Sequence, residues 1–350
     1  MCKSSFLKTA VICVTAFIIL SVVVVFAWSS TGVSVDRDTS DPGVLLANRD
    51  VDRASQYREG YFAFAGTTLH YVEAGKGDMV LFLHGFPSYW PSFQRQMEAL
   101  KADYHVVAID GLGAGKSDAP QDVEAYKLEA MADHVFALID HLGADQVHLV
   151  GHDWGSAFAI GLAQRYPKRV KSVIAFSAPP QNVILDILAN VPEERATFAY
   201  VEQFKRAHPA ILLAMGIEQS IWDGAYGPLV EAGHLSEEEG ALFRQATSDP
   251  KRIDAHINWY RANIPSPDAV SESDYWPARQ ARVVAPALYI WGSDDPIFSQ
   301  LAIDKMEALS DQSELMILED VGHWPHVERA KEVNAALRAH IAAASDTTAE

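Results

Sequence analysis

Cysteine is almost absent from this chain of 350 residues, and its two copies, Cys2 and Cys13, lie close to the N-terminus. The rest of the sequence therefore has neither a thiol nor a disulfide, which is compatible with an oxidising compartment. Basic residues are also scarce: 28 Lys and Arg against 46 Asp and Glu give a net charge of −18. A net charge of this sign argues against nucleic acid as a partner, and the acidic residues are spread along the chain rather than gathered in a tail.

A largely apolar stretch without a charged residue, residues 10–28, follows Lys3 and Lys8. As a helix it would be about 28 Å long, close to the hydrocarbon thickness of a bilayer. It is either an uncleaved signal-anchor or a signal peptide cleaved after residue 27, and its length favours the anchor. The charges around it predict a single-pass membrane protein with the rest of the chain extracytoplasmic; the alternative is a secreted or periplasmic protein. Residues 1–30 are thus assigned to this segment, and the polar residues 31–58 to a tether.

Short apolar runs alternate with helical patterns in residues 59–180 and again in residues 280–345. This alternation predicts an α/β fold with a doubly wound, mostly parallel sheet. The predicted strands are a hairpin over residues 61–72 and buried strands over residues 79–83, 104–109, 146–150, 170–176, 286–291 and 315–318. Helices are predicted over residues 91–102 and 124–142, and a closing helix runs to about residue 344.

Residues 181–279 interrupt this alternation with about a hundred residues of helical pattern, rich in aromatic and acidic side chains. An insertion between two strands of a parallel sheet lies where the carboxyl edge of the sheet opens. We therefore predict a helical cap over a pocket at that edge.

The strongest chemical signal follows the strand at residues 146–150. Gly151 and Gly155 flank Asp153 in the sequence GHDWG, a spacing typical of the strained strand-to-helix turn called a nucleophile elbow. A carboxylate needs no base for its own attack and is suited to displacing a leaving group from an sp3 carbon. The resulting ester must then be hydrolysed by activated water. The alternative is a structural aspartate that caps the next helix.

Two more groups complete a triad at predicted strand ends. Asp295 ends the turn GSDD, and His323 follows the last strand, which gives the order nucleophile, acid, histidine expected of this architecture. Together with HGFP at residues 84–87 and GHW at residues 322–324, these motifs make the chain resemble α/β-hydrolases of the epoxide hydrolase and haloalkane dehalogenase branch, from about residue 61 to residue 340.

The chemistry assigns roles to these residues. His323 would activate water for the second step, and Asp295 would orient it, with the adjacent Asp294 as the competing candidate. The backbone N–H groups of Phe86 and Trp154 are the expected oxyanion hole. The resemblance further implies a cis peptide bond before Pro87.

The predicted cap distinguishes the possible leaving groups. An epoxide oxygen leaves as an alkoxide and needs a hydrogen-bond donor, for which a phenol is suited. Residues 257–263 resemble the epoxide hydrolase segment that carries one ring-opening tyrosine, here Tyr260. Residues 198–204 lie where the second is found, and Tyr200 is the candidate. These residues favour hydrolysis of a small apolar epoxide to a vicinal diol.

The alternative is a haloalkane or haloacid dehalogenase that uses the same nucleophile. The position of Trp154, directly after Asp153, resembles that of a tryptophan in haloalkane dehalogenases whose indole binds halide. Phe86, however, stands where many of those enzymes have Asn. A non-enzymatic binding protein is the third class. Trp154 and Trp259 are the predicted substrate contacts, and the alternative for Trp259 is core packing.

The sequence predicts neither a cofactor nor a metal. His326 is spaced three residues from His323 without further ligands at useful spacing. The glycine-rich residues 110–118 match neither phosphate-binding spacing, so we interpret them as a structural turn.

Overall fold

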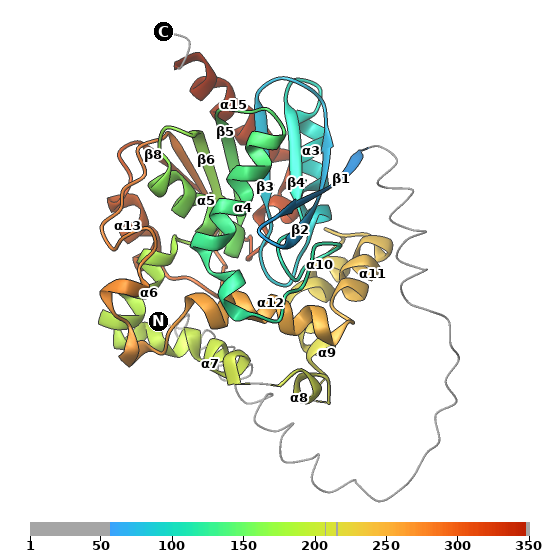
Figure 1. Ribbon diagram of the computed structural model, residues 1–350, viewed down its shortest axis with the longest axis vertical. Helices are drawn as coiled ribbons and strands as arrows, with labels where there is room; N and C mark the ends of the chain where they lie inside the picture. The colour runs from blue at the N-terminus through green and yellow to red at the C-terminus, as the bar shows by residue number, and fades with distance from the viewer. Residues whose placement is uncertain (1–56, 207, 215, 348–350) are drawn as a thin grey trace, which may run out of the picture.

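The computed structural model describes residues 57–347 apart from residues 207 and 215 (Figure 1). The predicted N-terminal anchor or signal peptide, and the tether up to residue 56, lie outside the described residues. The first strand already begins at Arg58, the last residue assigned to the tether. Within the part of the chain that is described, no helix is both long and apolar enough to cross a bilayer.

An eight-stranded sheet forms the centre of the molecule, in the order β1-β2-β4-β3-β5-β6-β7-β8. β1 pairs antiparallel with β2 and β2 antiparallel with β4, while the pairs from β4 through β3 to β8 are parallel. The predicted doubly wound, mostly parallel sheet is therefore confirmed. The strands are β1 (Arg58–Phe64), β2 (Thr67–Ala74), β3 (Met79–Leu83), β4 (His105–Ile109), β5 (Val147–His152), β6 (Val170–Phe176), β7 (Ala287–Gly292) and β8 (Ser313–Leu318).

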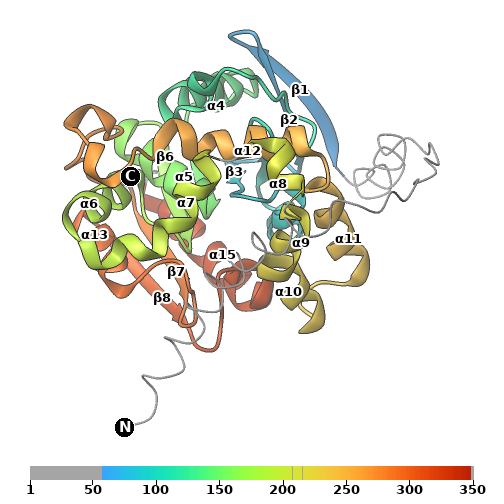
Figure 2. The same ribbon diagram turned by 90° about the horizontal axis from the view of Figure 1, so that it is seen from below.

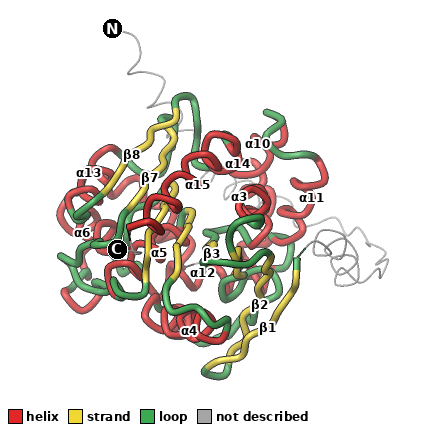
Figure 3. The backbone as a smooth tube through the Cα atoms, turned by 90° about the horizontal axis from the view of Figure 1, so that it is seen from above, coloured by secondary structure: helices red, strands yellow, loops and turns green. Residues whose placement is uncertain are grey.

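Helices cover both faces of this sheet. α4 and α5 lie on one face, and α3 and α15 lie on the other (Figure 3). The strands between them, β3 and β5 for example, are buried at every residue, as expected for apolar runs covered on both sides. The helices around the sheet are η2 (Trp90–Phe93), α3 (Gln94–Leu100), η3 (Val123–Tyr126), α4 (Leu128–His141), α5 (Trp154–Arg165), α13 (Gln300–Ala308), α14 (Pro325–Glu328) and α15 (Ala330–Thr347).

The chain between β6 and β7 is helical and lies together beyond one end of the sheet (Figure 1). Viewed from that end, α7, α8 and α12 cross in front of the strands (Figure 2). These cap helices are α6 (Gln181–Asn190), η4 (Pro192–Phe198), α7 (Ala199–Arg206), α8 (Pro209–Ala214), α9 (Ile217–Ile221), η5 (Trp222–Tyr226), α10 (Gly227–Glu231), α11 (Glu237–Ala246), α12 (Pro250–Asn263), η6 (Pro267–Ala269) and η7 (Glu272–Asp274).

Local sequence explains where the longer cap helices start. α11 begins with a capping box, in which Ser236 and Glu239 each accept the other's backbone N–H. α12 begins with Pro250 in the first turn, after Asp249, whose carboxylate accepts the N–H of Lys251. This start fixes the helix that carries Tyr260.

Candidate active site

Asp153 occupies a strained turn between β5 and α5. Its backbone lies at φ 54° and ψ −121°, a conformation that costs a non-glycine residue about 1–3 kcal/mol. The flanking glycines are required for space: a Cβ on Gly155 would lie 1.8 Å from the carbonyl oxygen of Leu83, and one on Gly151 would lie 2.1 Å from that of Gly155. The turn has the geometry of a nucleophile elbow, with an aspartate at its apex.

The Asp153 carboxylate lies between backbone donors and an imidazole. The N–H of Phe86 donates to its Oδ1 at 2.8 Å, and its Oδ2 lies 3.6 Å from Nε2 of His323. Burial would raise the pKa of Asp153, but the imidazole of His323 and the N–H of Trp154 outweigh burial and hold the pKa below its usual value. The side chain is therefore an ionised carboxylate at neutral pH.

His323 is held by Asp295 rather than by Asp294. Nδ1 of His323 donates to Oδ2 of Asp295 at 2.9 Å, and the other oxygen of that carboxylate accepts the N–H of Ile297 at 2.9 Å. The Asp295 side chain is 1% exposed, whereas Asp294 is exposed and accepts the hydroxyl of Ser293. The loop that carries His323 is held by a further hydrogen bond, since Nε2 of His152 donates to the carbonyl oxygen of His323 at 2.8 Å.

The surrounding charges set the basicity of His323. Burial by itself would lower the pKa of the imidazole, but the carboxylates of Asp295 and Asp153 outweigh it and raise the pKa to about 10. An ester on Asp153 removes one of these two charges. Loss of the charge on Asp153 would therefore lower the pKa of His323 and favour the neutral imidazole.

A pocket of about 340 Å³, including its opening to solvent, lies next to Asp153. Tyr200 from α7 and Tyr260 from α12 both line it, and their rings meet edge-on with centroids 6.2 Å apart. Burial, with the nearby charge of Asp153, raises the pKa of both phenols, so both remain protonated donors. The structure thus brings together residues that the sequence placed on separate segments.

The remaining predicted residues divide between pocket and core. Trp154 lines the pocket, and its indole lies edge-on against the ring of Tyr260, with centroids 5.0 Å apart. Trp259 is not among the pocket residues: its indole N–H donates to the carbonyl oxygen of Leu112 at 2.8 Å and its ring lies against His84. Its position corresponds to core packing, the alternative stated for it. The peptide bond between Phe86 and Pro87 is cis, as the resemblance implied.

His326 does not line the pocket, and its ring packs against those of Phe93 and Phe176. Burial lowers its pKa to about 3, so it is a neutral packing residue. Among the described residues, no group of three or more His, Cys, Asp or Glu side chains is arranged to hold a metal ion.

Sequence reasoning missed the apolar walls of the pocket. The residues that form them come from α5, the loop after β6, the cap and the segment after β7. In the sequence, each of these residues has the pattern of an ordinary core position. The walls are Ala157, Ala178, Ile184, Phe198, Val201, Ile264 and Phe298.

Comparison with known proteins shows which family this chain resembles. The model of the alpha/beta hydrolase fold family matches residues 78–215 and 229–330. Epoxide hydrolase 3 of Xenopus tropicalis is 30% identical over 282 residues, which cover 78% of this chain and 74% of that protein. Epoxide hydrolase 4 of Mus musculus is 29% identical, over 79% of this chain and 77% of that protein. The solved structure of a Bacillus megaterium epoxide hydrolase with an inhibitor superposes with a TM-score of 0.73 at 25% identity, covering 81% of this chain and 99% of that one.

Proposed function

The chain belongs to the epoxide hydrolase branch of the α/β-hydrolase fold family and is a hydrolase, and from this we propose that it opens an epoxide to a vicinal diol through an ester on Asp153. One observation carries the proposal. An ionised carboxylate at the elbow and two neighbouring phenols line the same apolar pocket. This pairs a nucleophile for carbon with donors for the departing oxygen.

In the first step, Oδ2 of Asp153 attacks a ring carbon and the carbon–oxygen bond of the epoxide breaks. Tyr260 and Tyr200 donate to the oxygen, and the alkoxide takes a proton from one of them. The phenol recovers that proton from solvent or from protonated His323. Because Oδ1 already accepts the N–H of Phe86, it becomes the ester carbonyl in place.

In the second step, neutral His323 takes a proton from water, and the hydroxide adds to the carbonyl carbon of the Asp153 ester. The charge that develops on Oδ1 is stabilised by the N–H groups of Phe86 and Trp154. The intermediate collapses, and the alkoxide of the diol takes the proton from His323. The carboxylic acid left on Asp153 gives its proton to His323 or to solvent, which returns the proton that the phenol took up in the first step and restores the carboxylate. The sum is epoxide plus water to diol.

The pocket walls favour a small apolar substituent. Apart from Asp153, the two tyrosines and the indole of Trp154, the lining is aliphatic or phenylalanine. Such a wall has no partner for a charged or hydroxylated substituent, whose burial would leave polar groups unsatisfied. We therefore propose apolar epoxides of about the size of styrene oxide as substrates.

Halide displacement is the second candidate, favoured by the position of Trp154 beside the nucleophile. Its indole, however, lies edge-on against Tyr260 with ring centroids 5.0 Å apart, and Phe86 contributes a ring where a second side-chain donor would be needed. A halide ion would therefore meet phenols and apolar walls. Epoxide opening uses the same groups without rearrangement.

The decisive experiment is a single turnover of styrene oxide with excess enzyme in water labelled with heavy oxygen. The ester route predicts that the first diol carries unlabelled oxygen from Asp153 and that label enters the carboxylate. Label in the first diol would mean direct attack by water and would overturn the ester mechanism. Halide release from bromoalkanes, measured on the same preparation, distinguishes the dehalogenase.

For the N-terminal segment we propose the membrane anchor stated above, with the hydrolase part extracytoplasmic. The apolar residues 10–28 and the lysines before them support it. Mass spectrometry of the mature N-terminus is the test: an intact N-terminus in the membrane fraction supports the anchor, and a terminus near residue 28 in the soluble fraction refutes it.

A further inference from the structure

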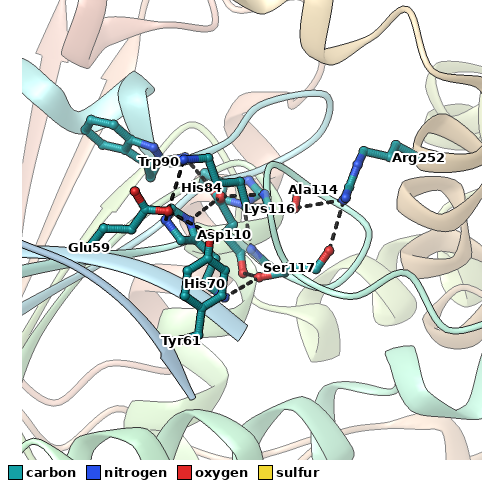
Figure 4. Close-up of polar contacts among 11 residues, drawn as sticks. Glu59, Tyr61, His70, His84, Trp90, Asp110, Ala114, Lys116, Ser117 and Arg252 are labelled. Atoms are coloured by element: carbon teal, nitrogen blue, oxygen red, sulfur yellow. Dashed lines mark hydrogen bonds and ion pairs between the residues drawn. The ribbon is translucent and has the colours of Figure 1, made fainter. Parts of the chain in front are cut away.

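Asp110 is a fully buried carboxylate at the end of β4, in the glycine-rich segment that the sequence indicated as a turn (Figure 4). Its Oδ2 accepts Nδ1 of His70 at 2.7 Å and the N–H of Lys116 at 2.9 Å, and its Oδ1 accepts the N–H of Trp90 at 2.9 Å. Burial would raise the pKa of Asp110, but these partners, His70 foremost, lower it. An ionised side chain with three donors is thus built into the interior.

The first connection of Asp110 leads to the oxyanion hole. Residues 84–90 are hydrogen-bonded to the Asp110 segment at both ends. At one end the N–H of Trp90 donates to the Asp110 carboxylate, and at the other the N–H of Gly111 donates to Nε2 of His84 at 2.8 Å. Nδ1 of His84 donates to the carbonyl oxygen of Gly85 at 2.9 Å, the residue before Phe86. The N–H that binds Asp153 therefore lies in a loop clamped on either side.

The second connection leads to α12, which carries Tyr260. Nη1 of Arg252 donates to the carbonyl oxygen of Ser117 at 2.9 Å, and the indole of Trp259 donates to that of Leu112 at 2.8 Å. The contact is close, since a Cβ on Gly113 would lie 2.9 Å from the backbone of α12. Asp110 holds this same segment through the N–H of Lys116, so the helix rests on a loop whose shape the carboxylate determines (Figure 4).

We propose that Asp110 is a positioning residue of the reaction, which holds the oxyanion N–H of Phe86 and the phenol of Tyr260 in their mutual placement around Asp153. The inference rests on the proposed function of that site. Catalytic groups must be held within about 0.5 Å, and a displacement of about 1 Å can cost about 10²-fold in rate. No side-chain atom of Asp110 needs to touch the substrate for this effect.

The outer end of the network reaches the surface and does not share this role. Nε2 of His70 lies 3.2 Å from Glu59, which also contacts the ammonium of Lys116 at 3.0 Å and accepts the hydroxyl of Tyr61. These groups shield the inner pair from solvent. These contacts join the groups to one another and to His70.

The test is Asp110→Asn, which keeps the shape but replaces one acceptor oxygen by an amide donor, so that a buried donor loses its partner. The matched control is Asp118→Asn, the same change at an exposed carboxylate that accepts one backbone N–H, from Thr68. Single-turnover rates of ester formation and of ester hydrolysis are measured separately with styrene oxide. We expect both rates to fall about 10- to 100-fold in Asp110→Asn with KM within about threefold, and neither rate to change more than twofold in the control.

A second variant separates the two connections and guards against a misfolded Asp110→Asn. Arg252→Met removes the guanidinium that ties α12 to the loop, and Arg244→Met is the control on α11, where the guanidinium binds Glu218 instead. We expect Arg252→Met to slow ester formation about tenfold and to leave ester hydrolysis unchanged. If Arg252→Met slows both steps equally, or slows neither step, the proposal is overturned.

Hydrogen exchange gives a readout that needs no substrate. In Asp110→Asn, peptides covering residues 84–90 and 250–263 should exchange faster than in the parent and in Asp118→Asn. If these peptides remain protected and the rates stay within twofold, Asp110 has no positioning role. If the parent enzyme forms neither ester nor diol while the exchange result holds, the proposed function fails and the structural link survives.

Discussion

Replacing Asp295 by asparagine isolates the second chemical step, because this carboxylate contacts His323 and not the nucleophile. Oδ1 of Asp295 accepts the N–H of Ile297, so the asparagine oxygen keeps that place and the amide nitrogen takes the position of Oδ2. The amide then donates to Nδ1 of His323 rather than accepting from it. The imidazole is forced to carry its proton on Nε2, facing Asp153 and the water site, and has no lone pair there to act as a base.

The structure also sets the size of the effect. An equivalent change of tautomer in a serine hydrolase triad lowers the rate by about 10⁴-fold. Here the side chain is 1% exposed, so bulk water has little room to replace the lost acceptor. We expect ester hydrolysis to slow about 10³- to 10⁴-fold, or about 4–5.5 kcal/mol. Ester formation needs no base and should change less than tenfold.

The assay is rapid mixing of enzyme with excess styrene oxide, quenched in acid and analysed by mass spectrometry. Asp295→Asn should accumulate a covalent adduct equal to the substrate mass, at one per active site, with a burst that precedes slow diol release. Asp294→Asn, the same change at the exposed neighbour, should turn over like the parent. An Asp295→Asn enzyme that shows no adduct, with both steps slowed together, would refute the assignment of His323 as base for the ester.

Three further outcomes test the site and its scaffold. Tyr260→Phe should slow ester formation about 10²-fold and Tyr200→Phe less, both without an effect on ester hydrolysis in the same quenched-flow assay; full activity of Tyr260→Phe would count against an epoxide substrate. The pKa of His323 is raised to about 10 in the folded protein, against about 6.5 in the unfolded chain. The ion pairs of His323 therefore contribute their full stabilisation at pH values below about 6.5, and this contribution is lost as the pH rises toward 10. The stability advantage over His323→Gln, from urea unfolding, should therefore shrink between pH 7 and 10; a constant difference would contradict the ion pairs. Gly155→Ala should destabilise by about 3 kcal/mol or more because its Cβ would meet the backbone of Leu83 at 1.8 Å, whereas Gly224→Ala, with nothing within 4 Å, should be neutral or stabilising by thermal melting.

The sequence alone was sufficient to place Asp153 at the tight turn between β5 and α5. GHDWG is a local motif: its glycines permit a turn that follows directly from one strand and starts the next helix, so position in the chain already implies position in the fold. The same holds for the parallel sheet, because strands buried on both faces read as continuous apolar runs. The triad order followed, since each member stands where a parallel strand ends at the same edge.

Only the tertiary structure decided which neighbouring groups act together. Asp294 and Asp295 are adjacent in sequence, and the backbone after β7 buries one against His323 and leaves the other in solvent. Tyr200 and Tyr260 come from different helices and meet because α7 packs against α12. Asp110 gave no signal of its own beyond a glycine-rich turn, since its partners lie in three separate segments. Such contacts depend on how distant elements pack, and no short-range spacing encodes that packing.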